Sequence, residues 1–331
     1  MSEARQPLLR VEDLRVHFPI RGGWRGGRVA TVKAVDGITL EVGAGETVAL
    51  VGESGCGKST AGNAILGLVK ATSGRIFFDG TDILAQKPDR QQALRRDMQV
   101  IFQDPVSALN PKLTVGRCIA EPLTIAGYDR KEKERRVDEL LELVGLLPVH
   151  KNRYPNEMSG GQRQRVVIAR ALALSPKLIV CDEPVSALDV SIRSQIINLL
   201  MRLQEELGLS YLFIAHDLSV VRHIADRVIV IYLGTIAEEG PTDAVFEHPT
   251  HPYTEALLAA IPLPDPRSQR VKPPFALEGD PPSPANPPKG CPFLTRCPIH
   301  MEDCATIRPV LADTGWNTKA ACLVRFKAAY G

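Results

Sequence analysis

A glycine-rich segment with a single lysine is the clearest chemical feature of the sequence. Residues 52–60 read GESGCGKST and match the pattern G-x-x-x-x-G-K followed by Ser or Thr. The run TVALV at 47–51 predicts a strand before it, and a helix is expected to begin near Ser59. Backbone N–H groups in such a turn can wrap phosphates, and the helix N-terminus adds partial positive charge. The segment predicts a phosphate site, against the alternative of a chance glycine-rich turn.

Two side chains of this segment have specific expected roles. Lys58 would reach the β and γ phosphates of a nucleotide and is counted among the catalytic residues, and Ser59 would hold Mg²⁺ through its hydroxyl. The contacts expected from this loop come from Gly52, Ser54, Gly55, Gly57, Lys58, Ser59 and Thr60.

An acidic pair follows a second strand-like run. Residues 178–183 read LIVCDE, so Asp182 falls at the end of the predicted strand and Glu183 directly after it. Asp182 could bind Mg²⁺, and Glu183 could then polarise an attacking water. Alone, such a pair often only caps a helix or forms a solvated turn. Together with the glycine-rich segment it predicts nucleotide hydrolysis.

A second anion-binding surface is expected at residues 158–162, which read MSGGQ. The helix-forming run RQRVVIARAL follows, so a helix N-terminus is presented beside small residues and a hydroxyl. Ser159, Gly160 and Gly161 are the candidate contacts. The chain therefore has two phosphate-binding surfaces, one copy of each.

These pieces, in this order, resemble ABC ATPases, whose signature is LSGGQ, over roughly residues 8–260. The resemblance implies further roles: Gln103 in VIFQDP as the Q-loop residue and a Mg²⁺ ligand, Asp189 of the D-loop, and His216 as the switch histidine. Phe18 is the candidate for stacking on adenine. A lone Gln or His at a strand end is usually a polar surface contact, but the shared order favours the functional interpretation.

Longer phrases resemble one branch of that family. GESGCGKST, FQDPVSALNP, DEPVSALDVS and HPTHPYTEALL are similar to the ATP-binding subunits of dipeptide and oligopeptide importers, in particular the F-type partner. The resemblance implies ATP and Mg²⁺ as cofactors, and import powered by ATP-driven dimer closure. It implies as partners a second, D-type ATP-binding subunit, two transmembrane permease subunits and a periplasmic or extracellular solute-binding protein. It places the chain peripherally on the cytoplasmic face of a bacterial inner membrane.

Single copies of both phosphate-binding motifs predict a dimer of motor subunits. The two motifs are expected to lie far apart on one chain, so each nucleotide would be held between two chains. Lys58, Ser59, Thr60, Gln103, Asp182, Glu183 and His216 would serve the chain's own ATP. Ser159, Gly160 and Gly161 would serve the partner's ATP. A heterodimer is favoured over a homodimer.

Four of the seven cysteines lie near the C-terminal end: Cys291, Cys297, Cys304 and Cys322. A reducing cytoplasm disfavours disulfides, and no C-x-x-C pair announces zinc. The proline-dense segment 262–288 and the tail behind it are too poor in periodic apolar residues to form a normal core. We predict that the four cysteines bind one metal centre. The family resemblance favours a 4Fe-4S cluster over zinc or free thiols, with His300 as a substitute ligand or an exposed loop residue.

The pattern of apolar residues predicts the strands and helices that position these residues. Strands are expected at 8–18, 47–51, 178–181, 211–215 and 228–232, and helices at 130–144 and 192–207, with a loop at 21–28. Buried strands alternating with helices predict an α/β fold with a mostly parallel core sheet. The ABC resemblance adds an N-terminal antiparallel β region, a helical subdomain at about 104–165 and a small cysteine-containing C-terminal extension. The expected domains are 1–261 and 262–331.

Composition narrows the function classes. The net charge of +2 over 331 residues is too balanced for a nucleic-acid polycation, and no apolar run is long enough to span a bilayer. The N-terminal residues lack a signal-peptide core, so a cytoplasmic location is expected. A soluble ABC protein acting on nucleic acid or ribosomes would need two cassettes or dedicated inserts. Nickel, glutathione or opine-like cargo stays open as an alternative to peptides.

Overall fold

The computed structural model describes residues 6–22, 27–261 and 279–326, which divide into two compact units. The first unit contains Val42–Glu46 and Ile83–Phe213. The second contains Gln6–Glu41, Thr47–Asp82 and the chain from Ile214 onward. The domain boundary expected after residue 261 stays a prediction, and residues 262–278 of the expected linker lie outside the described part.

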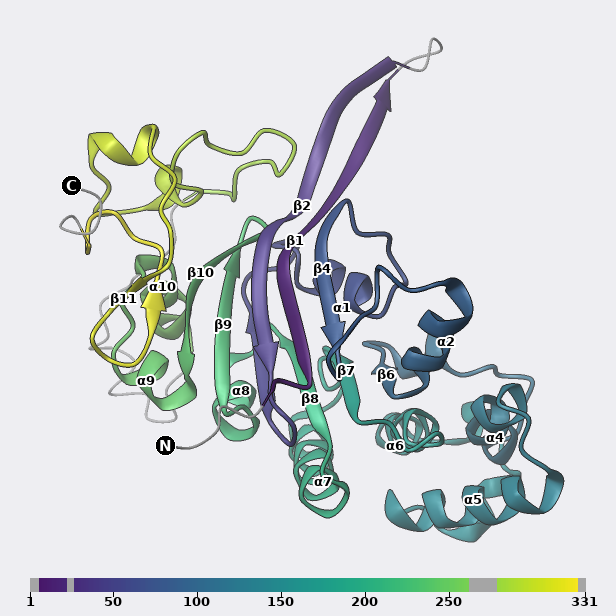
Figure 1. Cartoon of the computed structure of the whole chain (residues 1–331). Helices are drawn as coiled ribbons and strands as arrows, with labels where there is room; N and C mark the ends of the chain where they lie inside the picture. Colours follow the sequence, from purple (N-terminus) through teal and green to yellow (C-terminus); the bar gives the residue numbers. More distant parts are fainter. Residues whose placement is uncertain (1–5, 23–26, 262–278, 327–331) are drawn as a thin grey trace, which may run out of the picture. The chain divides into compact units, whose positions relative to one another are not determined.

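An antiparallel sheet opens the second unit, with strand order β2-β1-β4-β5. Its strands are β1 (Leu9–Gly22), β2 (Gly27–Val42), β4 (Ser73–Phe78) and β5 (Thr81–Asp82). Figure 1 shows β1 and β2 as one long hairpin. The expected loop at 21–28 was wrong in extent, because the strands continue through Gly22 and resume at Gly27; residues 23–26 are not described. Backbone pairing between neighbouring strands accepts glycine and arginine even though neither favours a strand.

A second set of strands in this unit runs in the order β11-β12-β10-β9-β3. The set comprises β3 (Thr47–Val51), β9 (Arg227–Tyr232), β10 (Thr235–Pro241), β11 (Ala312–Asp313) and β12 (Lys319–Ala320). β3 pairs in parallel with β9, and all five residues of β3 are buried, as expected for a strand covered on both faces. β10 pairs antiparallel with β9 and with β12, so a strand from the tail extends the sheet (Figure 1).

Helices of the second unit surround these strands. They are α1 (Lys58–Ile65), α8 (Leu218–Ile224), α9 (Thr242–Glu247) and α10 (Pro252–Ala259). The tail adds two single-turn 3-10 segments, η3 (Leu294–Arg296) and η4 (Glu302–Ala305). The described part of the tail, residues 279–326, therefore has little regular structure of its own.

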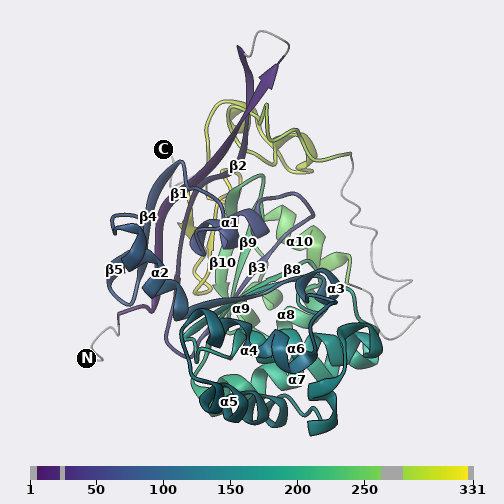
Figure 2. The same cartoon turned by 90° about the vertical axis from the view of Figure 1, so that its right-hand side faces the viewer.

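The first unit contains the parallel pair β6 (Met98–Ile101) and β7 (Leu178–Asp182), with β8 (Ser210–Ala215) beside β7. Its helices are α2 (Pro88–Arg96), α3 (Pro105–Ala108), α4 (Val115–Ile125), α5 (Arg130–Leu143), α6 (Gly160–Ala171) and α7 (Val190–Leu207). Two short 3-10 segments, η1 (Pro148–Asn152) and η2 (Pro155–Glu157), precede α6. Figure 2 shows α4, α5 and α6 grouped together. Within the described residues no helix is long and apolar enough to cross a membrane.

Helix ends in the first unit follow local sequence chemistry. Asp129 and Glu132 form a reciprocal capping box at the start of α5. α7 stops at Gly208, whose φ of 66° lies in the left-handed region. The helices expected at 130–144 and 192–207 are confirmed, as are the buried strands that flank the acidic pair.

Candidate functional site

The glycine-rich segment forms the turn between β3 and α1, and its backbone geometry requires glycine. Gly57 caps α1 with a φ of 108°, and a Cβ there would lie 2.1 Å from the Ala34 carbonyl oxygen. No other residue type fits that conformation and that space. The first-turn N–H groups of α1 are therefore presented by a turn that a side chain at residue 57 would disrupt.

Lys58 lies at the centre of this turn. Its side chain is 4% exposed, and Nζ donates to the carbonyl oxygens of Gly52 at 2.8 Å and Glu53 at 2.9 Å. The ammonium group is therefore buried, and the loop's own backbone holds it. A concentrated positive charge at the N-terminus of α1 is suited to an anionic ligand.

Two predicted catalytic side chains meet in the first unit. Gln103 follows β6, and its Nε2 donates to Glu183 Oε2 at 2.9 Å. Glu183 follows β7 with a φ of 48°, a left-handed conformation that is uncommon for residues other than glycine. Asp182 ends β7 and is partly buried. The amide therefore fixes the direction of a carboxylate placed directly after a buried strand.

The MSGGQ segment caps α6. Ser159 is the N-cap, its hydroxyl accepts a hydrogen bond from Gln162 N, and Gln162 Oε1 accepts one from Ser159 N. A Cβ on Gly161 would lie 2.6 Å from Ile192 of α7, so glycine allows close packing there. Ser159 and Gly160 are exposed. The segment thus offers an accessible, preformed helix N-terminus.

The remaining predicted residues are distributed between the two units. Asp189 is exposed at the N-cap of α7, in the first unit with Gln103, Asp182, Glu183 and the MSGGQ segment. The phosphate loop, Phe18 and His216 belong to the second unit. Phe18 lies on β1 and is 43% exposed, and His216 is exposed directly after β8.

The HPYT residues are built into the second unit near the phosphate loop. His251 caps α10, is buried, and accepts a hydrogen bond from Tyr253 N through Nδ1. Burial lowers the pKa of His251 to about 4, so its ring is neutral at pH 7. The Tyr253 hydroxyl accepts a hydrogen bond from Glu53 N at 2.8 Å. The HPYT residues, 251–254, therefore form a buried helix cap that reaches the phosphate loop.

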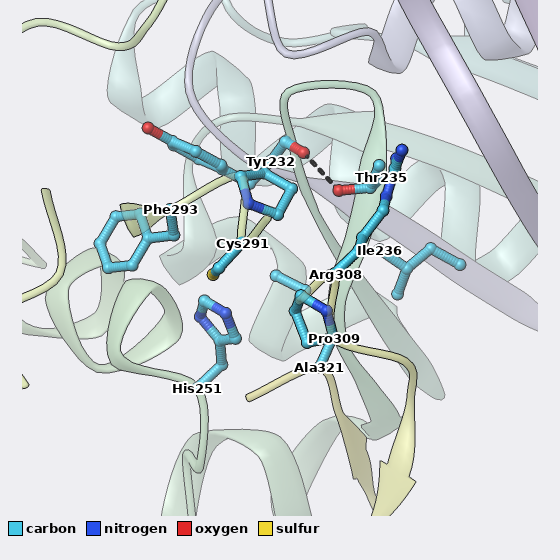
Figure 3. Close-up of a pocket in the computed structure, with 11 residues that line it drawn as sticks. Tyr232, Thr235, Ile236, His251, Cys291, Phe293, Arg308, Pro309 and Ala321 are labelled. Carbon is cyan, nitrogen blue, oxygen red and sulfur yellow. Dashed lines mark hydrogen bonds between the residues drawn. The ribbon is translucent and has the colours of Figure 1, made fainter. Parts of the chain in front are cut away.

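The four tail cysteines converge on one small cavity of about 10 Å³, which His251 and His300 also line. Cys291, Cys304 and Cys322 are buried, and Cys291 N donates to the Cys304 carbonyl oxygen at 2.8 Å. Burial raises the pKa of Cys291 to about 12, which keeps that thiol protonated unless a cation compensates. Figure 3 draws another pocket, which Cys291 and His251 also line, and shows the Cys291 sulfur on the side of the His251 ring.

No metal geometry is preformed around these thiols. All seven cysteines are free, and the described residues contain no group of three or more His, Cys, Asp or Glu arranged to hold a metal ion. A cavity of about 10 Å³ has room for roughly one water-sized occupant. The side chains would have to move outward to admit a four-iron cluster. His300 is exposed, and its Nδ1 lies 2.8 Å from the Cys297 carbonyl oxygen.

Sequence reasoning missed Glu53 and Arg296. Arg296 of η3 donates from Nη1 to Glu53 Oε2 at 2.6 Å and from Nη2 to Oε1 at 3.0 Å. Glu53 occupies a variable position of the glycine-rich pattern, and 243 residues separate it from Arg296. The only available sign was the HPYT motif, which contains Tyr253 and for which no chemistry was apparent.

Comparison with known proteins agrees with these features. Residues 35–186 match the family described as ABC transporter, and residues 237–304 match the Oligopeptide/dipeptide transporter, C-terminal region. The chain is 54% identical to the oligopeptide transport ATP-binding protein OppF of Escherichia coli, covering 98% of each chain. It is 46% identical to the dipeptide transport ATP-binding protein DppF of the same organism, over 96% of this chain and 95% of that protein.

Solved structures agree as well. A dimeric ATP-binding cassette in a post-hydrolysis state with ADP and Pi matches with a TM-score of 0.62 and 32% identity, over 71% of this chain and 98% of that one. The fold and the two helix N-termini thus define an ATPase of the ABC transporter class. Within that class, the chain belongs to the family of oligopeptide and dipeptide transport ATP-binding proteins.

Proposed function

We propose that this ATPase energises the uptake of oligopeptides or dipeptides. The supporting observation is full-length similarity to the oligopeptide transport ATP-binding protein of E. coli, which extends through the C-terminal region. The test is a proteoliposome assay with the assembled transporter and its solute-binding protein. Dipeptides or longer oligopeptides should stimulate ATP hydrolysis and accumulate inside. Stimulation by nickel, glutathione or an opine-like conjugate, with none by peptides, would reassign the cargo.

The active form in this proposal is a sandwich of two motor subunits, in which MSGGQ of one chain closes on the phosphate loop of the other. Single copies of both motifs support it, and the dimeric cassette that resembles this chain carries ADP and Pi. A heterodimer with a D-type subunit is proposed over a homodimer. Specific ATPase activity should fall as the isolated chain is diluted, and adding the D-type subunit should restore it. Activity strictly linear in concentration down to monomer would contradict the dimer.

The proposed catalytic roles are supported by the hydrogen bond between Gln103 and Glu183 and by the buried lysine of the phosphate loop. Glu183 polarises the attacking water, and the 2.9 Å bond from Gln103 orients its carboxylate. Ser59, Gln103 and Asp182 would hold Mg²⁺, Asp189 would contribute across the dimer, and His216 would contact the γ-phosphate. The exposed ring of Phe18 is available to stack on adenine. Catalysis would rest on positioning and electrostatics around that phosphate.

The proposed partners are two permease subunits and a solute-binding protein, with the chain attached peripherally to the cytoplasmic face of a bacterial inner membrane. Support comes from membership of a transport family. The permease subunits should co-purify with the chain from detergent-solubilised membranes. Recovery of the chain only in the soluble fraction, when the whole operon is expressed, would contradict this assignment.

We also propose that Cys291, Cys297, Cys304 and Cys322 bind one metal centre with a structural role, a 4Fe-4S cluster in preference to zinc. Convergence of all four on one cavity supports the centre, whereas the small volume favours a single ion unless the side chains move. Anaerobic purification followed by iron, sulfide and zinc analysis separates the two. About four irons per chain support the cluster, one zinc supports the rival, and a metal-free active complex with four titratable thiols rejects both.

A further inference from the structure

Glu53 is the point at which the phosphate loop meets the tail. Both oxygens of its carboxylate are bound by the guanidinium of Arg296, at 2.6 Å and 3.0 Å. The Arg296 side chain is 4% exposed and the Glu53 side chain 31%. The hydrogen bond with Glu53 raises the pKa of Arg296 above its ordinary value. A bidentate pair with a buried guanidinium has a fixed geometry, unlike a mobile surface pair.

The backbone of Glu53 is held from a second direction. Its N–H donates to the buried Tyr253 hydroxyl, and its carbonyl oxygen accepts from Lys58 Nζ. One loop residue is therefore held by the tail, by α10 and by the phosphate-binding lysine. Because the Lys58 ammonium is placed partly through that carbonyl, a shift of Glu53 would displace the group that is to meet the phosphates.

The tail holds Arg296 in place through an aromatic cluster. Phe293, three residues before Arg296, is 1% exposed and contacts Tyr232 and Tyr253, with ring centroids 5.1 Å and 5.5 Å apart. Arg296 N donates to the Phe293 carbonyl oxygen at 3.0 Å. Figure 3 shows Phe293 and Tyr232 beside Cys291 and His251. The position of the guanidinium thus depends on the packing of Phe293, which also lines the cysteine cavity.

Electrostatics give this arrangement a consequence for ATP binding. ATP with Mg²⁺ carries net negative charge, and an unpaired carboxylate within the phosphate loop would repel it. Arg296 neutralises that carboxylate from a buried position, where solvent and salt screen the pair only weakly. We propose that Arg296 and Tyr253 are positioning residues for the phosphate loop, so that a correctly packed tail sets the affinity of the motor for ATP.

The experiment measures ATP affinity of the full chain with a fluorescent ATP analogue, and KM and kcat for ATP in the assembled transporter. Arg296→Gln should weaken ATP binding about tenfold and raise KM for ATP by a similar factor, while kcat changes less than about twofold. Arg296→Lys keeps the positive charge but cannot form two parallel hydrogen bonds, so its ATP affinity should lie between those of wild type and Arg296→Gln. Adding Glu53→Gln to Arg296→Gln should restore affinity to within about threefold, because the repelling charge is gone.

Arg325→Gln is the matched control. Arg325 is another tail arginine, and its ion-pair partner is Glu255 of α10 at 2.9 Å, not a residue of the phosphate loop, so its loss should leave ATP affinity unchanged. Raising the ionic strength should reduce the difference in ATP affinity between wild type and Arg296→Gln, because salt screens the repulsion between the unpaired Glu53 carboxylate and ATP. The affinity of Arg325→Gln relative to wild type should not change.

Tyr253→Phe tests the same proposal without disturbing the ion pair between Arg296 and Glu53. It therefore replaces Arg296→Gln in the experiment if that variant does not fold. It keeps the ring packing and removes the acceptor for Glu53 N, so ATP binding should weaken about threefold to tenfold at unchanged kcat. If Tyr253→Phe and any folded Arg296 variant bind ATP within twofold of wild type, the proposal is wrong. Weakened binding in Arg296→Gln that Glu53→Gln fails to restore would also overturn it, since the unpaired Glu53 charge would then not be the cause of the weaker binding.

Discussion

The phosphate loop and the cysteine-rich tail belong to the same unit and are built by different means. The loop is a short turn between a fully buried strand and a helix, and its shape comes from backbone conformations such as that of Gly57. Within its described residues, 279–326, the tail forms two-residue strands and single 3-10 turns, and side-chain contacts with distant residues hold it. The shape of the phosphate loop can therefore be traced to a local sequence pattern, whereas the structure of the tail depends on contacts between residues far apart in the sequence.

The largest expected effect is a loss of ATP hydrolysis that leaves the stability of the tail unchanged. Glu183→Gln should lower turnover by about 10² to 10⁴, the usual contribution of a positioned base, and leave ATP binding intact. Single-turnover hydrolysis in the assembled complex measures the first quantity and analogue binding the second. The tail's metal content and melting temperature should not change. Normal turnover in this variant would remove Glu183 from its role.

Breaking the loop's backbone should affect binding itself. Gly57→Ala would place a Cβ 2.1 Å from the Ala34 carbonyl oxygen at a φ of 108°, so we expect ATP affinity to fall about 100-fold. Gly127→Ala is the control, because Gly127 also has a positive φ, 84°, but no atom within 4 Å of the added Cβ. Titration with a fluorescent ATP analogue compares them. Equal losses in both variants would show that general destabilisation is responsible.

Substitution of a tail cysteine should instead lower the free energy of unfolding. Cys304→Ser removes one candidate ligand at a site that is 4% exposed, and loss of a metal centre should cost more than about 3 kcal/mol. Cys118→Ser is the control, since Cys118 is a buried free thiol of the first unit, 1% exposed. Thermal unfolding monitored together with metal content decides the matter. Similar melting shifts in the two variants, with no change in metal content, would mean that the tail thiols act as ordinary buried side chains.

The smallest expected effect concerns a stacked pair between the tail and α9's C-terminal end. Trp316 stacks on His248 with ring centroids 4.0 Å apart and planes at 19°, yet Trp316 is 55% exposed. Trp316→Ala should lower stability by about 1 kcal/mol, and Trp316→Phe should retain most of it. Differential scanning calorimetry provides the comparison. A loss of several kcal/mol from Trp316→Ala would show that this stack, rather than the cysteine cavity, anchors the tail.

The contrast also explains what could be predicted from sequence. The strand, turn and helix around Lys58 were predictable because glycine spacing and apolar runs act over neighbouring residues. The hydrogen bond between Gln103 and Glu183 was not, although both strand ends were, because it depends on which strands become neighbours. The pairing of Arg296 with Glu53 could not be predicted, since Glu53 occupies a position that the motif leaves free and lies 243 positions away in the sequence. The loop expected at 21–28 failed because strand pairing extended beyond local preference.

The pairing of β12 with β10 has a consequence for the solubility of the chain. Without the tail, β10 would present unpaired backbone groups along Glu238 and Glu239, the residues that now pair with Ala320 and Lys319. An open strand of that kind is a template for pairing with another molecule. The tail strand fills this position: Lys319 pairs with Glu239 at 3.7 Å, and the buried Glu238 carboxylate accepts hydrogen bonds from the backbone of Thr250 and His251. Removal of the tail would therefore expose the backbone groups of β10 and favour self-association of the chain.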